Sequence, residues 1–423
     1  MGEPRRTRSG DRAAFLLSFS SFFVFPAIPI GNTTGLAIPS VLAPLLTFVW
    51  LGRIAKRDWA PYAWMTVPLA LSGCYVLLTG SVVAADVVPK VFGLLSVTFF
   101  IVIPTGYLLR SGYGEPFVLG AAYAVLVHAA IGAYQVFAFD NSEFPFAEVM
   151  STNPGMAMSP DTIDKYVEFV KRPFGLFAEP SAMAACVGPW LVLMSIVLFT
   201  PSLQQQFRRH RTVLMAALAS GLAFVAVSRS GQAVPIVAAS TACVVGPVFT
   251  AGRRPLSRWA ALGLGAAMVC GTAVWLLSSA ASRFDLSQNE SWQLRLSALE
   301  AASQYLGTTS LFGMGPGQSV SQIRSSGLGR FAPGNVTAVW SVTLTYAMET
   351  GLVGLAAMAM LGRSIGRAVW RSRARAAGLA FALVWLIGVL VGTSYAQQPA
   401  LWTAMATLLS WRSMTGDYEA ETP

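Results

Sequence analysis

Charged side chains are scarce in this sequence: Asp, Glu, Lys and Arg together make up only 11% of the residues. Hydrophobic residues make up 54%, and the mean hydropathy is +0.58. A soluble domain with this balance would expose too much apolar surface to stay in solution. The composition therefore excludes a soluble globular domain and predicts an integral membrane protein.

Residue types that bind metals are also few, with two histidines and four cysteines. His128 falls in an early apolar run and His210 in a short basic segment. Asp161 and Asp164 can share a helical face, but no further acid or His accompanies them, so a solvated charge pair is favoured. The sequence predicts no metal site and no cofactor. The cysteines match no metal or disulfide spacing and are expected to be small core residues; they are Cys74, Cys186, Cys243 and Cys270.

The net charge of +10 is the one total that suggests nucleic acid as a partner. The basic residues, however, fall in short clusters between apolar runs and form no basic face. We therefore predict no nucleic-acid binding and expect these clusters to set the orientation of the chain in a membrane.

Twelve apolar runs are long enough to cross a bilayer, allowing for tilt. The sequence thus predicts an all-α integral membrane protein with about twelve transmembrane helices. The predicted spans are 14–31, 36–51, 61–80, 91–109, 117–138, 181–200, 212–228, 232–250, 259–280, 338–362, 376–394 and 398–411.

Most of the 29 Lys and Arg residues lie in alternate loops, which the positive-inside rule places in the cytoplasm together with both termini. The basic segment before Phe15 is similar to a signal peptide, but no clear cleavage site follows it, so an uncleaved first span is expected. The cations that this topology places outside are Lys90, Lys165, Lys171, Arg172, Arg229, Arg283, Arg295, Arg324 and Arg330.

Two external segments, 139–180 and 281–337, are far longer than the other loops, and loops of such length are usually functional or disordered. Both contain aromatic and apolar residues, which indicates that they pack. They divide the chain into five parts. These are 1–138 with spans 1 to 5, 139–180, 181–280 with spans 6 to 9, 281–337, and 338–423 with spans 10 to 12 and a cytoplasmic tail.

The first long loop ends in a cluster of charge at the membrane boundary. Pro180 is best placed at the first helical position, where its missing N–H costs nothing, so Glu179 is the predicted N-cap. Lys171 and Arg172 then lie near a helix N-terminus, whose unpaired N–H groups carry partial positive charge. This arrangement suits an anion, although an ordinary capped helix start with snorkelling cations is equally favoured.

Two further charges are predicted at or near membrane depth. Ser228–Gly231 forms the whole external turn between two spans, which brings Arg229 close to the hydrocarbon. A guanidinium there costs roughly 2.5–3.5 kcal/mol at the bilayer centre and less toward the interface, and such residues often mark functional sites. Glu349 falls well inside the span 338–362. Pairing with an inward Arg and a buried structural role are equally favoured for it.

The second long loop predicts an amphipathic helix over about 290–307. Arg295 lies at the edge of its apolar face, where it reaches either a site beneath the helix or lipid headgroups. The glycines of Gly313–Gly317 let backbone N–H groups approach a ligand. That segment has neither the Gly-Lys-Ser/Thr of a Walker loop nor the strand of a dinucleotide site, so alone it predicts a turn. The predicted apolar face consists of Trp292, Leu296, Leu299 and Leu306.

Four segments occur together in a recognisable order: Arg172–Ser181, Ser228–Gly231, Arg295 with Leu311–Gly317, and Tyr346–Gly354. In these segments the sequence resembles bacterial O-antigen polymerases of the Wzy type and O-antigen ligases. These are polytopic glycosyltransferases, GT-C-like in fold, that act outside the cytoplasmic membrane. The resemblance covers about residues 170–355, whereas the spans on either side match only in hydrophobicity and number.

The resemblance implies a sugar chain held on a polyprenyl pyrophosphate, whose anomeric carbon is attacked by an acceptor hydroxyl as the lipid pyrophosphate leaves. Fixed cations aimed at the leaving group would lower the barrier, and Arg binds phosphate oxygens bidentately. Glu179 is then the expected general base, or it positions the hydroxyl. The residues expected at the pyrophosphate are Arg172, Arg229 and Arg295, with Lys171, Gly313, Gly315, Gly317, Arg324, Arg330 and Glu349 as further substrate-binding residues.

One departure separates the members of this family. Ligases that transfer the glycan to a lipid core typically carry a His shortly before the final Glu-x-Gly-Leu segment, where this chain has Trp340-Ser341. The expected function is therefore that of a metal-independent polymerase, which joins lipid-linked repeat units into a surface polysaccharide or exopolysaccharide. An O-antigen ligase or a protein O-oligosaccharyltransferase using the same donor remains the alternative.

The location that the resemblance implies is the bacterial inner membrane, with both long loops in the periplasm. The expected partners are the polyprenyl-pyrophosphate-linked donor and acceptor, the lipid bilayer, and proteins for chain-length control and export. An alternative from another class is a twelve-span transporter or flippase, because external arginines can bind an anionic substrate. Against it, the sequence lacks the two related halves that many transporters show.

Overall fold

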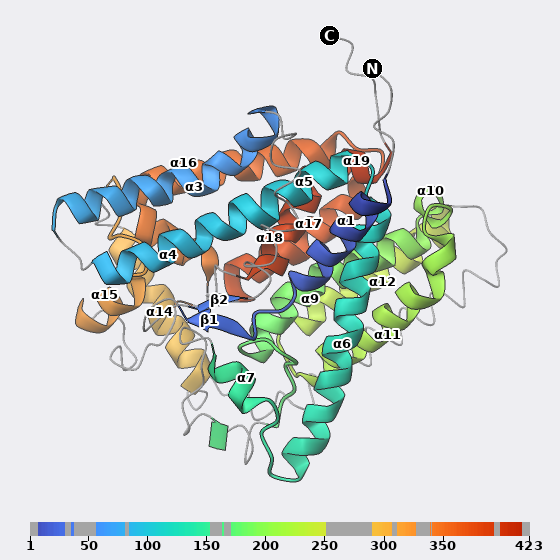
Figure 1. Cartoon of the computed structure of the whole chain (residues 1–423), viewed down its shortest axis with the longest axis horizontal. Coiled ribbons are helices and arrows are strands. Elements are labelled where there is room, and N and C mark those ends of the chain that lie inside the picture. Colours follow the sequence, from blue (N-terminus) through green and yellow to red (C-terminus); the bar gives the residue numbers. More distant parts are fainter. Residues whose placement is uncertain are drawn as a thin grey trace.

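The computed structural model describes residues 7–29, 35–37, 56–80, 84–152, 163–164, 171–250, 290–306, 311–326, 339, 341–392 and 398–416. Nearly all of these residues are helical (Figure 1). One short antiparallel pair of strands is present among them, β1 (Ala27–Pro29) with β2 (Gly35–Ala37). The predicted span 259–280 and most of the predicted span 36–51 lie outside the described residues.

The described helices are mostly α-helical. Three are not α-helical: the π-helical segments η1 (Thr98–Val102) and η5 (Gly388–Gly392) and the 3-10 turn η3 (Arg208–His210). The α-helices are α1 (Arg8–Ser20), α3 (Lys56–Leu78), α4 (Ala84–Val97), α5 (Ile103–Arg110), α6 (Gly114–Asp140), α7 (Ala147–Ser151), α9 (Pro180–Phe199), α10 (Pro201–Gln204), α11 (Arg211–Val227), α12 (Ala233–Thr250), α14 (Glu290–Leu306), α15 (Ser319–Ser326), α16 (Val342–Trp370), α17 (Arg375–Ile387), α18 (Pro399–Leu409) and α19 (Trp411–Met414).

Within the described part of the chain, five helices are long and apolar enough to cross a membrane. Shorter apolar helices accompany them at Tyr62–Leu78, Ala233–Val245, Arg375–Leu390 and Pro399–Leu409. The protein is therefore a helical membrane protein, as the composition predicts, while the number of twelve spans stays a prediction. The five long helices are Val87–Arg110, Gly114–Asp140, Pro180–Phe199, Arg208–Val227 and Val342–Trp370.

The first predicted span, 14–31, differs from the structure. Helix α1 ends at Ser20, and the chain then turns into β1. Two prolines, Pro26 and Pro29, lie in this stretch. Each removes a backbone donor and clashes with the preceding turn of a helix, so a helix through residue 31 would lose hydrogen bonds that hydrocarbon cannot replace.

Hydrogen bonds and an ion pair gather several chain segments at one end of the bundle, which we call the terminal end. The backbone N–H of Thr7 donates to Tyr113 Oη (3.2 Å), and His210 Nε2 lies 3.5 Å from Glu115 Oε1. Arg110 Nη1 donates to Ser410 Oγ (3.5 Å). The elements at this end carry Arg8, Arg12, Arg110, Arg208, Arg209, Arg211, Arg371, Arg373, Arg375 and Arg412.

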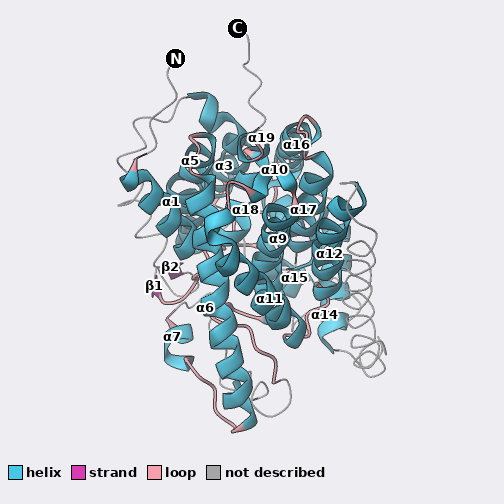
Figure 2. Ribbon diagram, turned by 90° about the vertical axis from the view of Figure 1, so that its right-hand side faces the viewer, coloured by secondary structure: helices cyan, strands magenta, loops and turns pink. Residues whose placement is uncertain are grey.

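The opposite end, which we call the loop end, holds β1, α7, the segment 171–180 and the turn between α11 and α12. Figures 1 and 2 both place α7 far from α10 and α19. Fewer cations lie here among the described residues than at the terminal end. They are Lys171, Arg172 and Arg229.

Helix α9 is the centre of the bundle (Figure 2). Every residue from Pro180 to Leu198 is buried, and α6, α11, α12, α17 and α18 pack around it. Its sequence is apolar on all sides, and such a helix is stable only when other helices surround it completely. Its N-terminus is thereby fixed at the loop end.

Helix α16 is interrupted at Gly351, whose φ of 64° and ψ of −150° are not helical. The segment Leu311–Gly317 lies against this break. The N–H groups of Met314 and Gly315 donate to the carbonyls of Met348 and Glu349, both at 3.1 Å. The N–H of Val353 donates in turn to Leu311 O (3.2 Å). The loop thus satisfies backbone groups that the interrupted helix leaves open, as a membrane interior requires.

Helix α14 forms where the sequence predicts it, but its buried face is a different one. Ala298, Ala301 and Ala302 are buried with Met348 of α16, whereas Leu299, on the predicted apolar face, is 49% exposed. Small residues let two helix backbones approach closely, so alanines rather than leucines make this contact. The side chains of Trp292 and Leu306 lie outside the described part.

We expect the Gly313→Ala variant to be less stable than the wild type by about 2–4 kcal/mol, because its Cβ combines a strained backbone with overpacking. Gly313 has a φ of 72°, and a Cβ there would lie 2.6 Å from the Glu349 carbonyl. The Gly362→Ala variant on α16 is the control, since no atom lies within 4 Å of its Cβ. Thermal unfolding in one detergent compares them, and equal midpoints would contradict the role of this loop.

Candidate functional site

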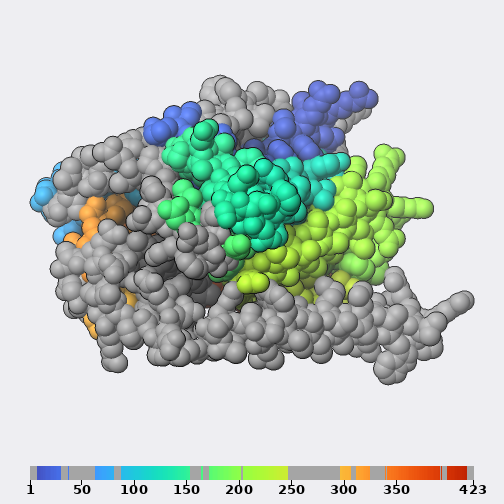
Figure 3. Space-filling view, turned by 90° about the horizontal axis from the view of Figure 1, so that it is seen from below, coloured from blue at the N-terminus to red at the C-terminus, as the bar shows by residue number. Residues whose placement is uncertain are grey.

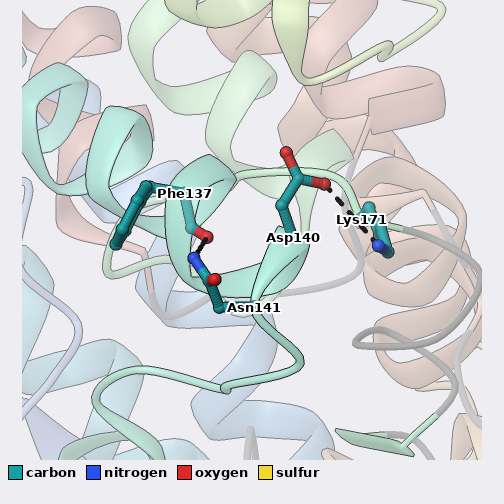
Figure 4. Close-up of polar contacts among 4 residues, drawn as sticks. All are labelled: Phe137, Asp140, Asn141 and Lys171. Atoms are coloured by element: carbon teal, nitrogen blue, oxygen red, sulfur yellow. Dashed lines mark hydrogen bonds and ion pairs between the residues drawn. The ribbon is translucent and has the colours of Figure 1, made fainter.

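The segment that begins at Lys171 brings charge to the loop end of the bundle. Lys171 has a left-handed backbone with a φ of 42°. Its Nζ lies 3.6 Å from Asp140 Oδ1 at the end of α6, where Asn141 Nδ2 also donates to Phe137 O (2.9 Å; Figure 4). Both charged side chains are exposed, at 41% and 69%. An ion pair this exposed contributes little to stability. The ammonium group of Lys171 therefore lies at the surface of the loop end.

Arg172 joins this segment to the turn between α11 and α12. Its Nε donates to Ser228 O (2.7 Å) and its Nη2 to Arg229 O (2.8 Å). Hydrogen bonds from a charged donor are stronger than neutral ones, and two of them fix the plane of the guanidinium. Two motifs that are more than fifty residues apart in the sequence are therefore in direct contact.

Arg229 lies at the tip of that turn. Its φ is 54°, a left-handed conformation that costs a non-glycine residue energy and persists only where neighbouring contacts enforce it. The two hydrogen bonds from Arg172 are such contacts. Ser228 and Ser230 beside it are buried, whereas the Arg229 side chain is exposed. The turn thus exposes the side chain of Arg229 and buries those of Ser228 and Ser230.

Glu179 is the N-cap of α9 and Pro180 its first residue, as the sequence predicts. The carboxylate does not cap the backbone. Instead, its Oε1 accepts a hydrogen bond of 2.6 Å from Ser181 Oγ, and the side chain is half-buried. Gln232 Nε2 donates to Ser181 O (3.0 Å), which ties the start of α12 to the start of α9. The acid, the helix N-terminus and the Arg229 turn form one hydrogen-bonded assembly.

Two residues of α6 that the sequence analysis did not select hold the turn after Arg172. Gln135 and His128 are fully buried and contact the backbone of Phe174, Gly175 and Leu176. They are seven residues apart, so they lie on the same face of the helix. Polar residues at that spacing in an apolar helix are the signal that could have identified them. Seen from below, α6 adjoins the region of α10 to α12 at the surface (Figure 3).

Glu349 and the glycine loop form a second polar cluster at the break in α16. Glu349 accepts hydrogen bonds from Ser319 Oγ (2.8 Å at Oε1) and from the N–H groups of Gly317 and Ser319. Ser72 Oγ donates to its carbonyl (2.5 Å). The N–H groups of this loop are therefore engaged with α16 itself. Of the two roles considered for Glu349, these contacts support a buried structural acid.

For the remaining predicted site residues, the structure describes at most the backbone. Arg295 lies on α14 and Arg324 on α15, with their side chains outside the described part. Arg330 and Asp161 lie outside the described residues altogether. Within the ranges that are described, no three His, Cys, Asp or Glu side chains gather in a way that could hold a metal ion.

No protein-family model and no curated protein matches the sequence. The resemblance to O-antigen polymerases and ligases therefore rests on the four motif segments. The structure brings two of them, Arg172–Ser181 and Ser228–Gly231, into contact with each other. It also brings the two others, Leu311–Gly317 and Tyr346–Gly354, into contact.

The Gly175→Ala variant is expected to lose about 2–4 kcal/mol of stability, since an added methyl group is strained and overpacked there. The φ of Gly175 is 63°, and a Cβ would lie 2.7 Å from His128 Nδ1. In the neighbouring turn, Gly231 has no atom within 4 Å of its Cβ position, and Gly231→Ala serves as the control. Chemical denaturation in mixed micelles measures both, and a Gly175→Ala protein as stable as the control would rule out this packing.

Proposed function

We propose that the protein is a membrane glycosyltransferase that polymerises polyprenyl-pyrophosphate-linked oligosaccharide repeat units. The observation that supports this most is the contact of Arg172 with the Ser228–Arg229 turn beside Glu179. It gathers fixed cations, a carboxylate and a helix N-terminus at the loop end of a membrane protein. A reaction with an anionic leaving group and a hydroxyl nucleophile needs these groups.

In the proposed reaction, the acceptor hydroxyl oxygen attacks the anomeric carbon of the donor. The bond from that carbon to the pyrophosphate oxygen breaks, and the lipid pyrophosphate leaves with the electron pair. Glu179 takes the hydroxyl proton, while Ser181 Oγ holds the carboxylate in place. Arg229 carries the exposed guanidinium that binds the pyrophosphate, with Lys171 and the N-terminus of α9 adding positive potential.

The proposed orientation places the basic terminal end in the cytoplasm and the loop end outside, in accord with the positive-inside rule. The lipid-linked donor then reaches the site from the outer leaflet of a bacterial inner membrane. The polymer formed is a surface polysaccharide or exopolysaccharide. Neither histidine offers the base of a ligase at this site, because His128 is buried against Leu176 and His210 pairs with Glu115 at the terminal end.

A second candidate is a transporter or flippase, and the break in α16 favours it. Transporters often place discontinuous helices at their binding sites, and Glu349 lies at such a break. The loop Leu311–Gly317 occupies that break with its own hydrogen bonds, however, which favours a fixed structural element over a binding site for a transported substrate.

The first test supplies the reconstituted protein with its native lipid-linked repeat unit and separates the products by size. A ladder of multiples is expected. Its rate of formation should fall about 100-fold or more in Arg229→Ala, which loses the charge that stabilises the leaving group, and in Arg172→Ala, which loses the support of the Arg229 turn. Arg209→Ala, an exposed site at the terminal end, is the matched control. Extension of an added lipid or protein acceptor without a ladder would establish a ligase, and movement of the substrate across the vesicle membrane would establish the transporter.

Glu179→Gln should lower single-turnover rates by about 10²–10⁴-fold, which is the usual contribution of a general base. The amide oxygen still accepts the hydrogen bond from Ser181, so the fold and the binding of donor should change little. Glu179→Asp, which keeps a carboxylate, should retain part of the rate. A Glu179→Gln protein with wild-type turnover would exclude Glu179 as the base.

A further inference from the structure

Two polar side chains on the core face of α6 explain how Arg172 is held. His128 and Gln135 have no exposed surface and are surrounded by apolar residues. A polar group buried without a partner destabilises a protein, so such residues persist where their hydrogen bonds are used. Gln135 directs all of its printed hydrogen bonds to Phe174 and Gly175, and His128 directs its Nδ1 to Leu176.

The amide of Gln135 uses both of its ends. Its Oε1 accepts from the N–H groups of Phe174 (2.9 Å) and Gly175 (2.8 Å), and its Nε2 donates to Gly175 O (2.9 Å). Three hydrogen bonds to two consecutive residues fix both the position and the rotation of the turn. His128 adds an Nδ1 acceptor for the N–H of Leu176 (3.2 Å).

The imidazole of His128 is itself held between aromatic rings. Its ring centroid lies 4.9 Å from that of Phe23 and 4.5 Å from that of Phe177. A Cβ on Gly175 would lie 2.7 Å from its Nδ1, so the turn approaches α6 as closely as a glycine allows. The turn therefore rests on a surface of α6 that has little freedom to move.

This support acts on Arg172 across a single residue. Pro173 separates Arg172 from Phe174, and its ring fixes its own φ at about −65°. The direction in which Arg172 leaves the turn is thus set by the position of Phe174. From there its guanidinium reaches the carbonyls of Ser228 and Arg229.

We infer that Gln135 is a positioning residue for the reaction: its amide sets the turn at Phe174 and Gly175, and through Arg172 it sets the backbone from which the Arg229 side chain extends. The inference rests on the proposed function for its catalytic part only. His128 supports the same turn from the preceding part of the helix. A displacement of about 1 Å in a group that binds the substrate can lower turnover about 100-fold. A residue that does not touch the substrate therefore affects the rate when it holds such a group in place.

Hydrogen exchange of the intact chain in micelles tests the geometric part without any substrate. In Gln135→Leu, the amides of a peptide covering 171–179 should exchange about tenfold faster or more, because two of their acceptor contacts are gone. Phe137→Leu, at a 66% exposed position on the same helix, should exchange as the wild type does. Unchanged exchange in Gln135→Leu would overturn the inference, whatever the activity of the protein.

Two further variants keep this test decisive if Gln135→Leu does not fold. Gln135→Asn keeps the amide but is one methylene shorter, so the amides of 171–179 should exchange about tenfold faster than in the wild type. Gln135→Glu, when protonated, offers one carbonyl acceptor and one O–H donor, which is the pattern of the native amide. The amides of 171–179 should therefore exchange as slowly in Gln135→Glu as in the wild type. Equal exchange rates in Gln135→Asn and Gln135→Glu would overturn the inference.

A double-mutant cycle on the rate of ladder formation tests the catalytic part. Gln135→Leu should lower the rate about tenfold or more in the wild-type background and less than about twofold in Arg172→Ala, because coupled residues are not additive. Equal effects in both backgrounds would overturn the inference that Gln135 acts through Arg172. A wild-type protein that forms no ladder would overturn the proposed function instead, and the exchange experiment would then decide the inference alone.

Discussion

The two hydrogen bonds from Arg172 to the carbonyls of Ser228 and Arg229 determine where charge lies at the loop end. Ser228 caps the C-terminus of α11, whose last carbonyls carry partial negative charge. These dipoles lie between the guanidinium of Arg172 and the following residue, Arg229. The charge of Arg172 is thereby held by backbone dipoles at the turn that carries Arg229. The strained conformation of Arg229 follows from the same contact.

The two polar clusters of the protein are joined by the π-helical segment η5. A Cβ on Gly392 would lie 2.5 Å from Gln232 Nε2, so η5 is packed closely against the start of α12. Thr343 Oγ1, in the first turn of α16, donates to Val389 O (3.4 Å). Helix α16 continues from there to its break at Gly351. Segments of π-helix often occur at functional sites, and this one lies between the group of residues around Glu179 and the helix that carries Glu349.

Local signals in the sequence were sufficient for the parts of the fold that depend on neighbouring residues. Proline at position 180 and the apolar run after it predict the start of α9 correctly, because both act within one turn of helix. The apolar face predicted for α14 is not the face that contacts α16, because that contact is made by small residues that a hydrophobic pattern does not single out. Gln135 was missed because its partners are backbone groups about forty residues away, so only its seven-residue spacing from His128 marks it in the sequence. The break at Gly351 depends on its backbone conformation, which a hydropathy pattern does not predict.

The dependence of α16 on the loop Leu311–Gly317 has a consequence for the biogenesis of the protein. A transmembrane segment usually enters the bilayer with its backbone already satisfied by its own helix. Here the carbonyl of Glu349 finds donors in Ser72 Oγ and in the loop Leu311–Gly317, and the carbonyl of Met348 finds its donor in that loop, a segment made earlier. In the proposed orientation that segment is translocated before α16 emerges. In that orientation α16 forms these backbone hydrogen bonds when it packs against a loop that has already crossed the membrane.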